Sequence, residues 1–282
     1  MSENERLEIE TEAKKLQKMY QDDPRSKSFN AIIYGGFGTG KSSLLRTCRR
    51  PILVDSFDPG GSKVLDGYMD IKGWPEEYKL DDEIYKDTRF EVEDPSRPTA
   101  AKLWDEEYHR RKRMGFFDQI GTYAVDSMTT LAQDIMYSIM QKAGRAGGTP
   151  FQQDWLPQMT VIENFMRDMV SLPCDCILIG HDDADKDEAT GRMFIGLMIT
   201  GKLKRRVPLL FDEIYSAQTN ETSSGIEYKL LTRSTGLYQA RTRLGKGGEL
   251  DTYEKPDIKN ILRKVGLPTE DKPRLINSTK EQ

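Results

Sequence analysis

The sequence predicts an α/β fold in which a mostly parallel sheet is flanked by helices and followed by a β-hairpin. Short apolar runs with the length of buried strands occur four times, at 30–34, 52–54, 123–125 and 176–179. Segments of helical periodicity separate these runs, and such alternation is typical of parallel sheets. Two further apolar runs flank a polar turn and predict the hairpin, at 211–217 and 227–233.

The helices are predicted from apolar residues that recur three and four positions apart. The clearest run extends from Met128 to Ala143 and ends at a glycine-rich break. Weaker runs predict further helices at 3–20, 99–113, 159–169 and 258–265.

The composition excludes several classes of protein. Among 282 residues, 42 Lys and Arg face 46 Asp and Glu, so the net charge of −4 argues against a general polyanion binder. No run of 18 apolar residues is present, and the acidic N-terminus lacks the apolar core of a secretory signal. With three cysteines no disulfide framework is expected, and Cys174 and Cys176 are interpreted as core residues. We expect a cytoplasmic protein that contacts no membrane.

The strongest motif lies between the first predicted strand and a predicted helix. Residues 35–42, GGFGTGKS, match the phosphate-binding pattern G-x-x-x-x-G-K-[ST] in full. Glycines let backbone N–H groups surround phosphate oxygens, and the lysine brings a positive charge to the β- and γ-phosphates. The motif predicts nucleotide binding by Gly35, Gly36, Phe37, Gly38, Thr39, Gly40, Lys41, Ser42 and Ser43.

A P-loop works with Mg²⁺, and the sequence offers two residues to hold this ion. Ser42 supplies a hydroxyl ligand, and Asp126 follows the third strand, beside the P-loop at the carboxyl end of the sheet. An aspartate before a strong helix is also a common N-cap, so that simpler interpretation of Asp126 stays open.

Hydrolysis also needs a carboxylate that orients water. Asp55 and Asp58 follow the second strand, and the turn 58–61 would present Asp58 outward, although a purely turn-forming aspartate is the alternative. His181 follows the fourth strand. It is a candidate sensor of the γ-phosphate or a link to a DNA loop, and the alternative is a plain strand-end histidine.

The order of these motifs resembles that of the RecA/RadA-like P-loop ATPases, over roughly residues 28–246. Besides the P-loop and the hairpin, the shared features are Val125-Asp126-Ser127, Gly180-His181 and Arg241-Thr242-Arg243. More narrowly, the chain is similar to core-only relatives encoded by phages, the phage nucleotide-binding proteins, which act in recombination and single-strand annealing.

The resemblance implies a RecA-like core in which the strand of Asp126 lies one strand away from the P-loop strand. It places the sensor His181 on the strand between them. It also implies ATP and Mg²⁺ bound between subunits of a homo-oligomer, with Arg241 or Arg243 from the neighbouring subunit. Finally, it implies a DNA-facing loop after the sensor strand, here 182–201.

Two features depart from the family pattern. RecA-type enzymes carry a glutamate two residues past the aspartate that ends the second strand; counted from Asp55 that position is Phe57, and Asp58 follows. The water-orienting carboxylate therefore stays open, and we expect slow hydrolysis. The DNA-facing loop also begins with residues that repel phosphate, namely Asp182, Asp183, Asp185, Asp187 and Glu188.

Three basic runs are candidate contacts for nucleic acid, at His109–Arg113, Lys202–Arg206 and Arg241–Lys246. For the first run, a solvated helix end is an equal alternative.

The chain divides into three parts by these criteria. Residues 1–26 form an N-terminal helical arm for oligomerisation or docking, 27–250 form the RecA-like ATPase core, and 251–282 form a charged tail with a short helix. Within the core, the acidic, proline-interrupted segment 66–98 is an insertion or surface excursion.

The sequence thus predicts a RecA-like ATPase acting on single-stranded DNA in phage recombination or replication, by annealing, pairing or loading, in the host cytoplasm. A single-strand DNA-binding protein is an expected partner. The catalytic candidates are Lys41, Asp126, Asp58, His181, Arg241 and Arg243. One alternative is a weakly hydrolysing nucleotide switch that scaffolds a protein partner. The other is a small-substrate P-loop kinase, which the hairpin disfavours, and the lack of an N-K-x-D motif disfavours a GTPase.

Overall fold

The structure, a computed structural model, describes residues 2–186, 190–223, 225–245 and 247–276. Within these residues the chain forms a nine-stranded mixed sheet in the order β11-β9-β8-β1-β5-β4-β2-β3, with β10 paired to β8. The strands from β8 to β3 in this order run parallel, and β9, β10 and β11 pair antiparallel. The strands of this sheet are β1 (Asn30–Tyr34), β2 (Ile52–Ser56), β3 (Ile84–Asp87), β4 (Thr122–Asp126), β5 (Asp175–Gly180), β8 (Glu213–Thr222), β9 (Gly225–Leu231), β10 (Arg241–Thr242) and β11 (Tyr253–Glu254). The predicted α/β fold with its C-terminal hairpin is confirmed.

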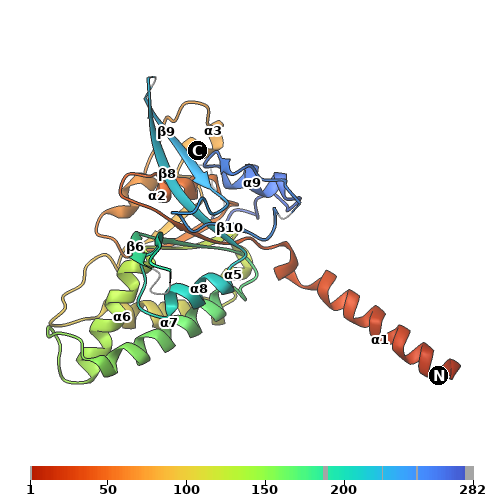
Figure 1. The fold of residues 1–282 in the computed structure, drawn as a ribbon, viewed down its shortest axis with the longest axis horizontal. Helices are drawn as coiled ribbons and strands as arrows, with labels where there is room; N and C mark the ends of the chain where they lie inside the picture. Colours follow the sequence, from red (N-terminus) through yellow and green to blue (C-terminus); the bar gives the residue numbers. More distant parts are fainter. Residues whose placement is uncertain (1, 187–189, 224, 246, 277–282) are drawn as a thin grey trace, which may run out of the picture.

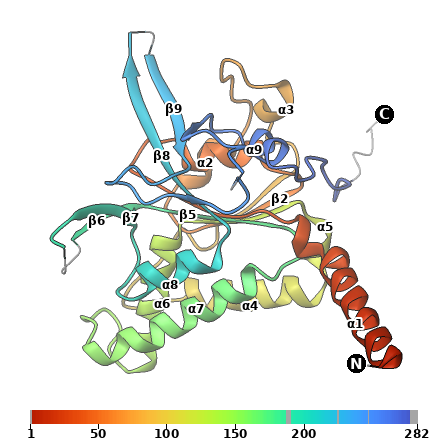
Figure 2. The same ribbon diagram turned by 45° about the vertical axis from the view of Figure 1, so that its right-hand side comes forward.

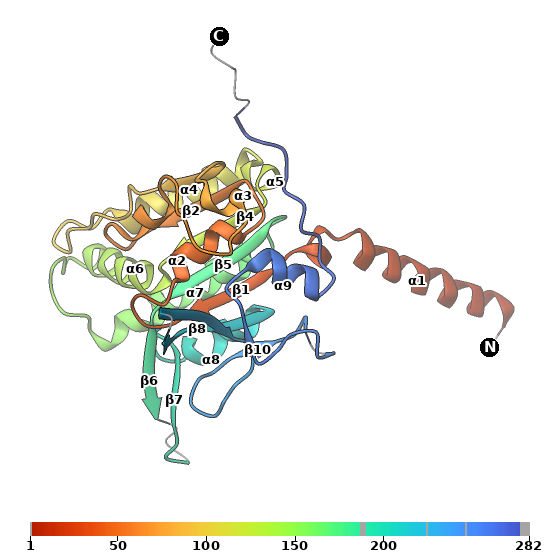
Figure 3. The ribbon, with the colours of Figure 1, turned by 90° about the horizontal axis from the view of Figure 1, so that it is seen from above.

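Helices cover both faces of the sheet (Figure 2). One face carries α4 (Ala100–Arg113), α5 (Phe116–Gln119), α6 (Met128–Lys142), α7 (Trp155–Met169) and α8 (Leu203–Leu210). The other carries α2 (Lys41–Leu44), α3 (Glu76–Lys79) and α9 (Ile258–Lys264), which Figure 3 shows from above. Trp104 and Met166 belong to the core on the first face, and Leu45 and Ile261 to the core on the second. Because both faces are covered, β1 is buried along its whole length.

The register of the parallel strands brings four functional segments to one edge of the sheet. Tyr34 pairs with Gly180, Ser56 pairs with Asp126, and β5 lies between β1 and β4. The P-loop, His181, Asp126 and the turn after β2 therefore share the carboxyl edge, where ligands bind in open α/β sheets. This arrangement confirms the expected RecA-like order, with the strand that precedes His181 between the other two.

The acidic segment 66–98 differs from the prediction of a mere excursion, because part of it joins the sheet. It contains α3 and then β3, which pairs parallel with β2 as an edge strand. The apolar pattern of β3 is limited to Ile84 and Tyr85, and Lys86 and Asp87 complete the strand. A pattern this short does not predict a strand.

The segment expected as a DNA-facing loop contains an antiparallel hairpin of β6 (Asp182–Lys186) and β7 (Met193–Leu197). Asp187 and Glu188 lie outside the described residues. The following basic run begins helix α8, which the sequence did not predict because Pro208 lies within it.

Helix α1 (Glu3–Asp22) projects away from the core (Figure 1). Its apolar residues Leu7, Ile9, Leu16 and Met19 are each more than half exposed, at 56–64 %. The predicted helix is present, and its role in docking stays a prediction. Across the described residues, every helix is too short or too polar to cross a lipid bilayer.

Candidate nucleotide-binding site

The P-loop connects β1 to α2 and holds a buried lysine. Gly38 and Gly40 have φ angles of 71° and 79°, a left-handed region that glycine adopts without steric cost. Lys41 Nζ donates hydrogen bonds to the carbonyl oxygens of Gly35 and Gly36, at 2.8 and 2.7 Å. Burial lowers the pKa of Lys41, and the nearby carboxylates oppose this shift. Because neutral carbonyls hold the ammonium, phosphate oxygens can replace them with a gain in attraction.

Ser42 and Asp126 form the pair predicted for Mg²⁺. Ser42 Oγ donates to Asp126 Oδ2 at 2.5 Å. Asp126 is 3 % exposed, and burial raises its pKa to about 6 although the hydrogen bond from Ser42 lowers it. The cap of α6 is Ser127, whose side chain accepts from the N–H of Thr130, so the N-cap interpretation of Asp126 is wrong.

This pair fits Mg²⁺, because P-loop sites use a hydroxyl as direct ligand and a carboxylate acting through water. Among the described residues, no group of three or more His, Cys, Asp or Glu side chains could hold a metal. A Mg²⁺ ion here would complete its coordination with nucleotide oxygens and water, as this ion usually does.

Asp58 lies across the same cavity and is oriented by three side chains. Its Oδ1 accepts hydrogen bonds from Ser127 Oγ, at 2.8 Å, and from the hydroxyl of Thr130. Its Oδ2 lies 3.2 Å from His181 Nε2. The turn itself is made by the main chain, since the N–H of Gly61 donates to the Asp58 carbonyl at 2.8 Å. The carboxylate therefore faces the site, which favours the functional interpretation of Asp58 over the purely turn-forming one.

The turn that carries Asp58 is fixed by Glu91, a residue that the sequence analysis missed. Glu91 accepts hydrogen bonds from the hydroxyls of Ser56 and Ser62, both at 2.7 Å, and from the N–H of Gly60 at 2.9 Å. Burial acts to raise the pKa of Glu91, but these hydrogen bonds lower it below its usual value. Nothing in the acidic segment 66–98 distinguishes Glu91 from its neighbours before the chain folds.

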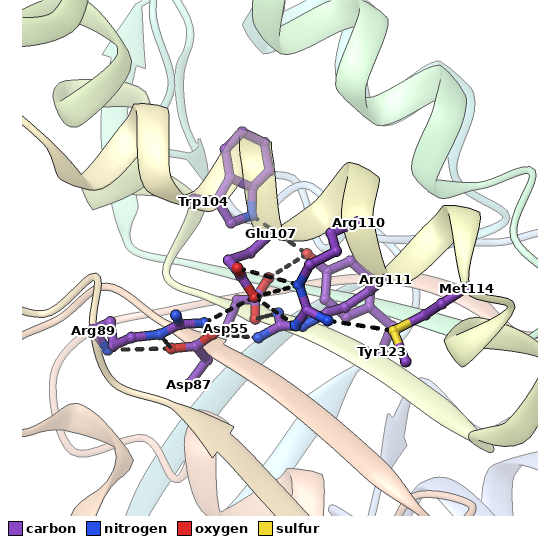
Figure 4. Close-up of polar contacts among 9 residues, drawn as sticks. All are labelled: Asp55, Asp87, Arg89, Trp104, Glu107, Arg110, Arg111, Met114 and Tyr123. Carbon is purple, nitrogen blue, oxygen red and sulfur yellow. Dashed lines mark hydrogen bonds and ion pairs between the residues drawn. The ribbon is translucent and has the colours of Figure 1, made fainter.

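Asp55, the other candidate for orienting water, belongs to a separate cluster beneath α4 (Figure 4). Its carboxylate accepts from Arg111 and from the hydroxyl of Tyr123, both at 2.7 Å. Burial raises the pKa of Asp55 to about 6, against the lowering by Arg111 and Tyr123. Arg111 also pairs with Asp87. Asp55 is fully buried and does not line the cavity, so it is placed in the core and not in the site.

The same cluster accounts for much of the first basic run. Arg111 is buried in its two ion pairs, Arg110 pairs with Glu107 at 2.8 Å, and Lys112 pairs with Asp168. These contacts favour the structural interpretation of this run over nucleic-acid binding.

The site opens into a cavity of about 610 Å³, within the size range of nucleotide pockets. Phe37 to Ser43, Asp58, Asp126 and His181 line one part of it. The remaining wall was missed by the sequence analysis and is apolar: Val64, Met69, Ile71, Trp74, Tyr228 and Pro256. In the sequence, this wall could have been inferred from Met69, Ile71 and Trp74, three apolar residues within the acidic segment 66–98.

Arg241 and Arg243 lie away from this cavity. β10 pairs with the amino end of β8, whereas the P-loop follows the carboxyl end of β1. Arg241 donates to two carbonyls at the end of α8, at 2.5 and 2.7 Å, and Arg243 donates to a third at 2.9 Å. Their action on a neighbouring subunit stays a prediction. Lys246 lies outside the described residues.

The acidic start of the β6–β7 hairpin is partly neutralised within the chain. Lys204 of α8 pairs with Asp183 and Asp185, both at 2.9 Å. Asp182 lies beside the P-loop, since a Cβ atom added to Gly36 would be 3.8 Å from its carboxylate. The hairpin thus connects the nucleotide site to the second basic run.

The fold and these contacts define a nucleotide-binding site of the P-loop type on a RecA-like α/β core. Residues 27–244 match the family model of the AAA domain, and the chain belongs to this family. No curated protein matches the sequence.

Two solved structures are similar at low identity. A KaiC-like protein from Pyrococcus horikoshii OT3, a hyperthermophilic archaeon, has a TM-score of 0.38 and 12 % identity, over 76 % of this chain and 81 % of its own. An ATPase from the type III secretion system of pathogenic bacteria has a TM-score of 0.41 and 13 % identity, over 89 % of this chain and 59 % of its own.

Proposed function

We propose that this chain binds ATP with Mg²⁺ and hydrolyses it slowly in the cavity beside the P-loop. The observation that carries the proposal is the convergence of three groups on one cavity. These are the ammonium of Lys41, the hydrogen-bonded pair of Ser42 and Asp126, and the oriented carboxylate of Asp58. Membership of the AAA domain family supports nucleotide chemistry at this place.

Each group has a distinct task in this proposal. Lys41 binds the β- and γ-phosphate oxygens, and Ser42 and Asp126 hold the metal. Bound Mg²⁺ would neutralise charge on these oxygens. Asp58 orients the attacking water and accepts its proton, while His181, which follows β5, holds the carboxylate in place. Because His181 directly precedes β6, it also connects the site with the β6–β7 hairpin.

The test is steady-state ATP hydrolysis by the full chain, with and without single-stranded DNA. Lys41→Ala is the blank, and Lys102→Ala, at an exposed position on α4, is the matched control. We expect turnover that depends on Mg²⁺, disappears in Lys41→Ala and persists in Lys102→Ala. Equal turnover in Lys41→Ala and the wild type would contradict the proposal.

We further propose that single-stranded DNA is the polymer on which the ATPase acts, in annealing, pairing or loading during phage recombination or replication in the host cytoplasm. The support is the start of α8, where Lys202, Arg205 and Arg206 are exposed beside the β6–β7 hairpin. A single-strand DNA-binding protein would be its partner. We expect DNA to stimulate hydrolysis and rising salt to abolish the stimulation, because phosphate contacts release counterions. Stimulation that persists in Lys202→Ala/Arg205→Ala would contradict this placement.

We propose a homo-oligomer with ATP at the interfaces between subunits. The arginines of β10 lie at the amino ends of the parallel strands, and the P-loop lies at their carboxyl ends. One chain could therefore present Arg241 and Arg243 to the P-loop of the next.

The second candidate function is a nucleotide switch that hydrolyses ATP poorly and docks a partner protein through α1. The exposed apolar residues of α1 favour it. A change of assembly mass on ATP addition, with negligible turnover, would support the switch, and ready hydrolysis would exclude it.

A further inference from the structure

We propose that the apolar end of the cavity binds the purine base of the nucleotide and that the base stacks on Trp74. This inference rests on the proposed nucleotide binding and adds the part of the site that recognises the base. The cavity lining combines the charged side chains of Lys41, Asp58 and Asp126 with six apolar ones. These six are Val64, Met69, Ile71, Trp74, Tyr228 and Pro256; we call them the apolar end, and Tyr228 is the member that lies against the P-loop.

Three of these side chains come from residues 66–79, which we call the strap. The strap closes on itself, because the N–H of Met69 donates to the carbonyl of Lys79 at 2.8 Å. Arg46, fully buried just after α2, donates to four carbonyls near the ends of the strap. These hydrogen bonds are 3.0–3.1 Å long and reach Val64, Asp66, Gly67 and Lys79. The strap is therefore anchored to the turn that directly follows α2, the helix that begins with Lys41, which fixes its place relative to the P-loop.

Trp74 and Tyr228 are the two aromatic side chains of the apolar end, and Trp74 packs on a buried neighbour. It makes a T-shaped contact with the buried Tyr78, with ring centroids 6.0 Å apart. Tyr228 of β9 lines the same cavity and lies against the P-loop, since a Cβ atom added to Gly40 would be 3.2 Å from its ring. A base that extends from the P-loop would lie between these two aromatic side chains.

The apolar end, which we also call the base wall, recognises a base by stacking and shape. Stacking accepts any base and grows with ring area, so purines are favoured over pyrimidines. Among the six apolar-end residues, the polar side-chain groups are the Tyr228 hydroxyl and the Trp74 indole N–H. Sites that discriminate strongly do so through dedicated hydrogen bonds, and apolar contacts separate similar ligands much less. We therefore expect ATP and GTP to bind with affinities within about tenfold of each other.

The test is titration calorimetry of the full chain with Mg²⁺ and four ligands: ATP, GTP, CTP and tripolyphosphate. Trp74→Ala should weaken ATP and GTP roughly five- to hundredfold, the range for one lost base–aromatic stack, and leave tripolyphosphate unchanged. Trp74→Phe should recover most of the affinity. Trp155→Ala, on α7 at the opposite face of the sheet, should change none of the four.

Two results would overturn the inference while leaving the nucleotide site intact. One is ATP affinity in Trp74→Ala within twofold of wild type, although Lys41→Ala loses both ATP and tripolyphosphate. The other is GTP binding more than a hundredfold weaker than ATP binding. If instead Lys41→Ala binds ATP and tripolyphosphate as the wild type does, the proposed nucleotide site is wrong and the base wall falls with it.

Discussion

Asp55 and Asp126 lie near the carboxyl ends of the adjacent strands β2 and β4, and both are buried. Burial raises the pKa of each to about 6. Their partners differ. Asp55 meets the guanidinium of Arg111 and the hydroxyl of Tyr123 inside the core, whereas Asp126 meets the hydroxyl of Ser42 and borders the cavity.

Burial and a raised pKa therefore do not by themselves identify a functional carboxylate. Arg111, a cation fixed in the core, and Tyr123 occupy both carboxylate oxygens of Asp55, so this residue is not available to bind a ligand. A neutral hydroxyl leaves Asp126 with unused acceptor capacity that faces a cavity. We call these two arrangements the closed cluster, Asp55 with Asp87 and Arg111, and the open cluster, Asp126 with Ser42 and Asp58.

The largest expected effect is on turnover, from the open cluster. Asp58→Asn should lower ATP hydrolysis roughly 10²–10⁴-fold, because an amide cannot accept the proton of water. Affinity for ATP and thermal stability should stay near those of the wild type. Asp105→Asn, exposed on α4, is the control. Turnover within threefold of wild type, measured under saturating ATP, would remove Asp58 from the mechanism.

Arg111→Met should act on stability instead. It would leave the buried Asp55 without its cation and Asp87 with Arg89 as its remaining cation, so we expect the free energy of unfolding to fall by about 3–5 kcal/mol. Urea denaturation measures this loss, and Arg113→Met, exposed at the end of the same helix, should cost little. A loss below about 1 kcal/mol would show that the closed cluster is not held together by its ion pairs.

A smaller expected effect is the pH dependence that Asp126 gives to the free energy of unfolding. The folded chain holds a proton on Asp126 up to about pH 6, whereas the unfolded chain releases it near 3.8. Ionised Asp126 therefore costs stability, and this cost grows as pH rises from about 4 to 6. Compared with wild type, Asp126→Asn should gain up to about 3 kcal/mol of unfolding free energy between pH 4 and pH 7. Denaturation without Mg²⁺ or nucleotide measures the difference in unfolding free energy between Asp126→Asn and wild type. A difference that does not change with pH would contradict the raised pKa of Asp126.

The smallest expected effect is the recovery of turnover in mixtures of two inactive variants. This experiment shows whether the open cluster is complete within one chain. Mixing Lys41→Ala with Arg243→Ala subunits leaves about a quarter of the interfaces with both residues intact, if subunits exchange freely. We expect up to about that share of wild-type turnover. The same mixture with Arg241→Ala distinguishes the two arginines. If no mixture exceeds the turnover of its separate components, the arginines do not act between subunits.

Much of the open cluster could be predicted from sequence for a local reason. The P-loop motif is contiguous, and Asp126, Asp58 and His181 each follow a short apolar strand. Parallel strands end at one edge, so the residues that follow them meet without any knowledge of side-chain packing.

The closed cluster and the base wall could not be predicted in this way. Arg111 stands in a basic run and becomes a core residue only when α4 packs over β2 and β3. The base wall combines Trp74, Tyr228 and Pro256, which come from segments far apart in the chain. Their meeting depends on Arg46 and on the β8–β9 hairpin, and no local pattern reports either contact.

The three thiols of the chain give it a practical chemical property. Cys48, Cys174 and Cys176 are all buried and unpaired, and burial raises the pKa of Cys48 and Cys176 well above the usual value. Thiolates are the reactive form, so these native positions should react slowly with maleimides while the chain stays folded. A single cysteine introduced on α1 or the strap can therefore carry a fluorescent label without removal of the native thiols.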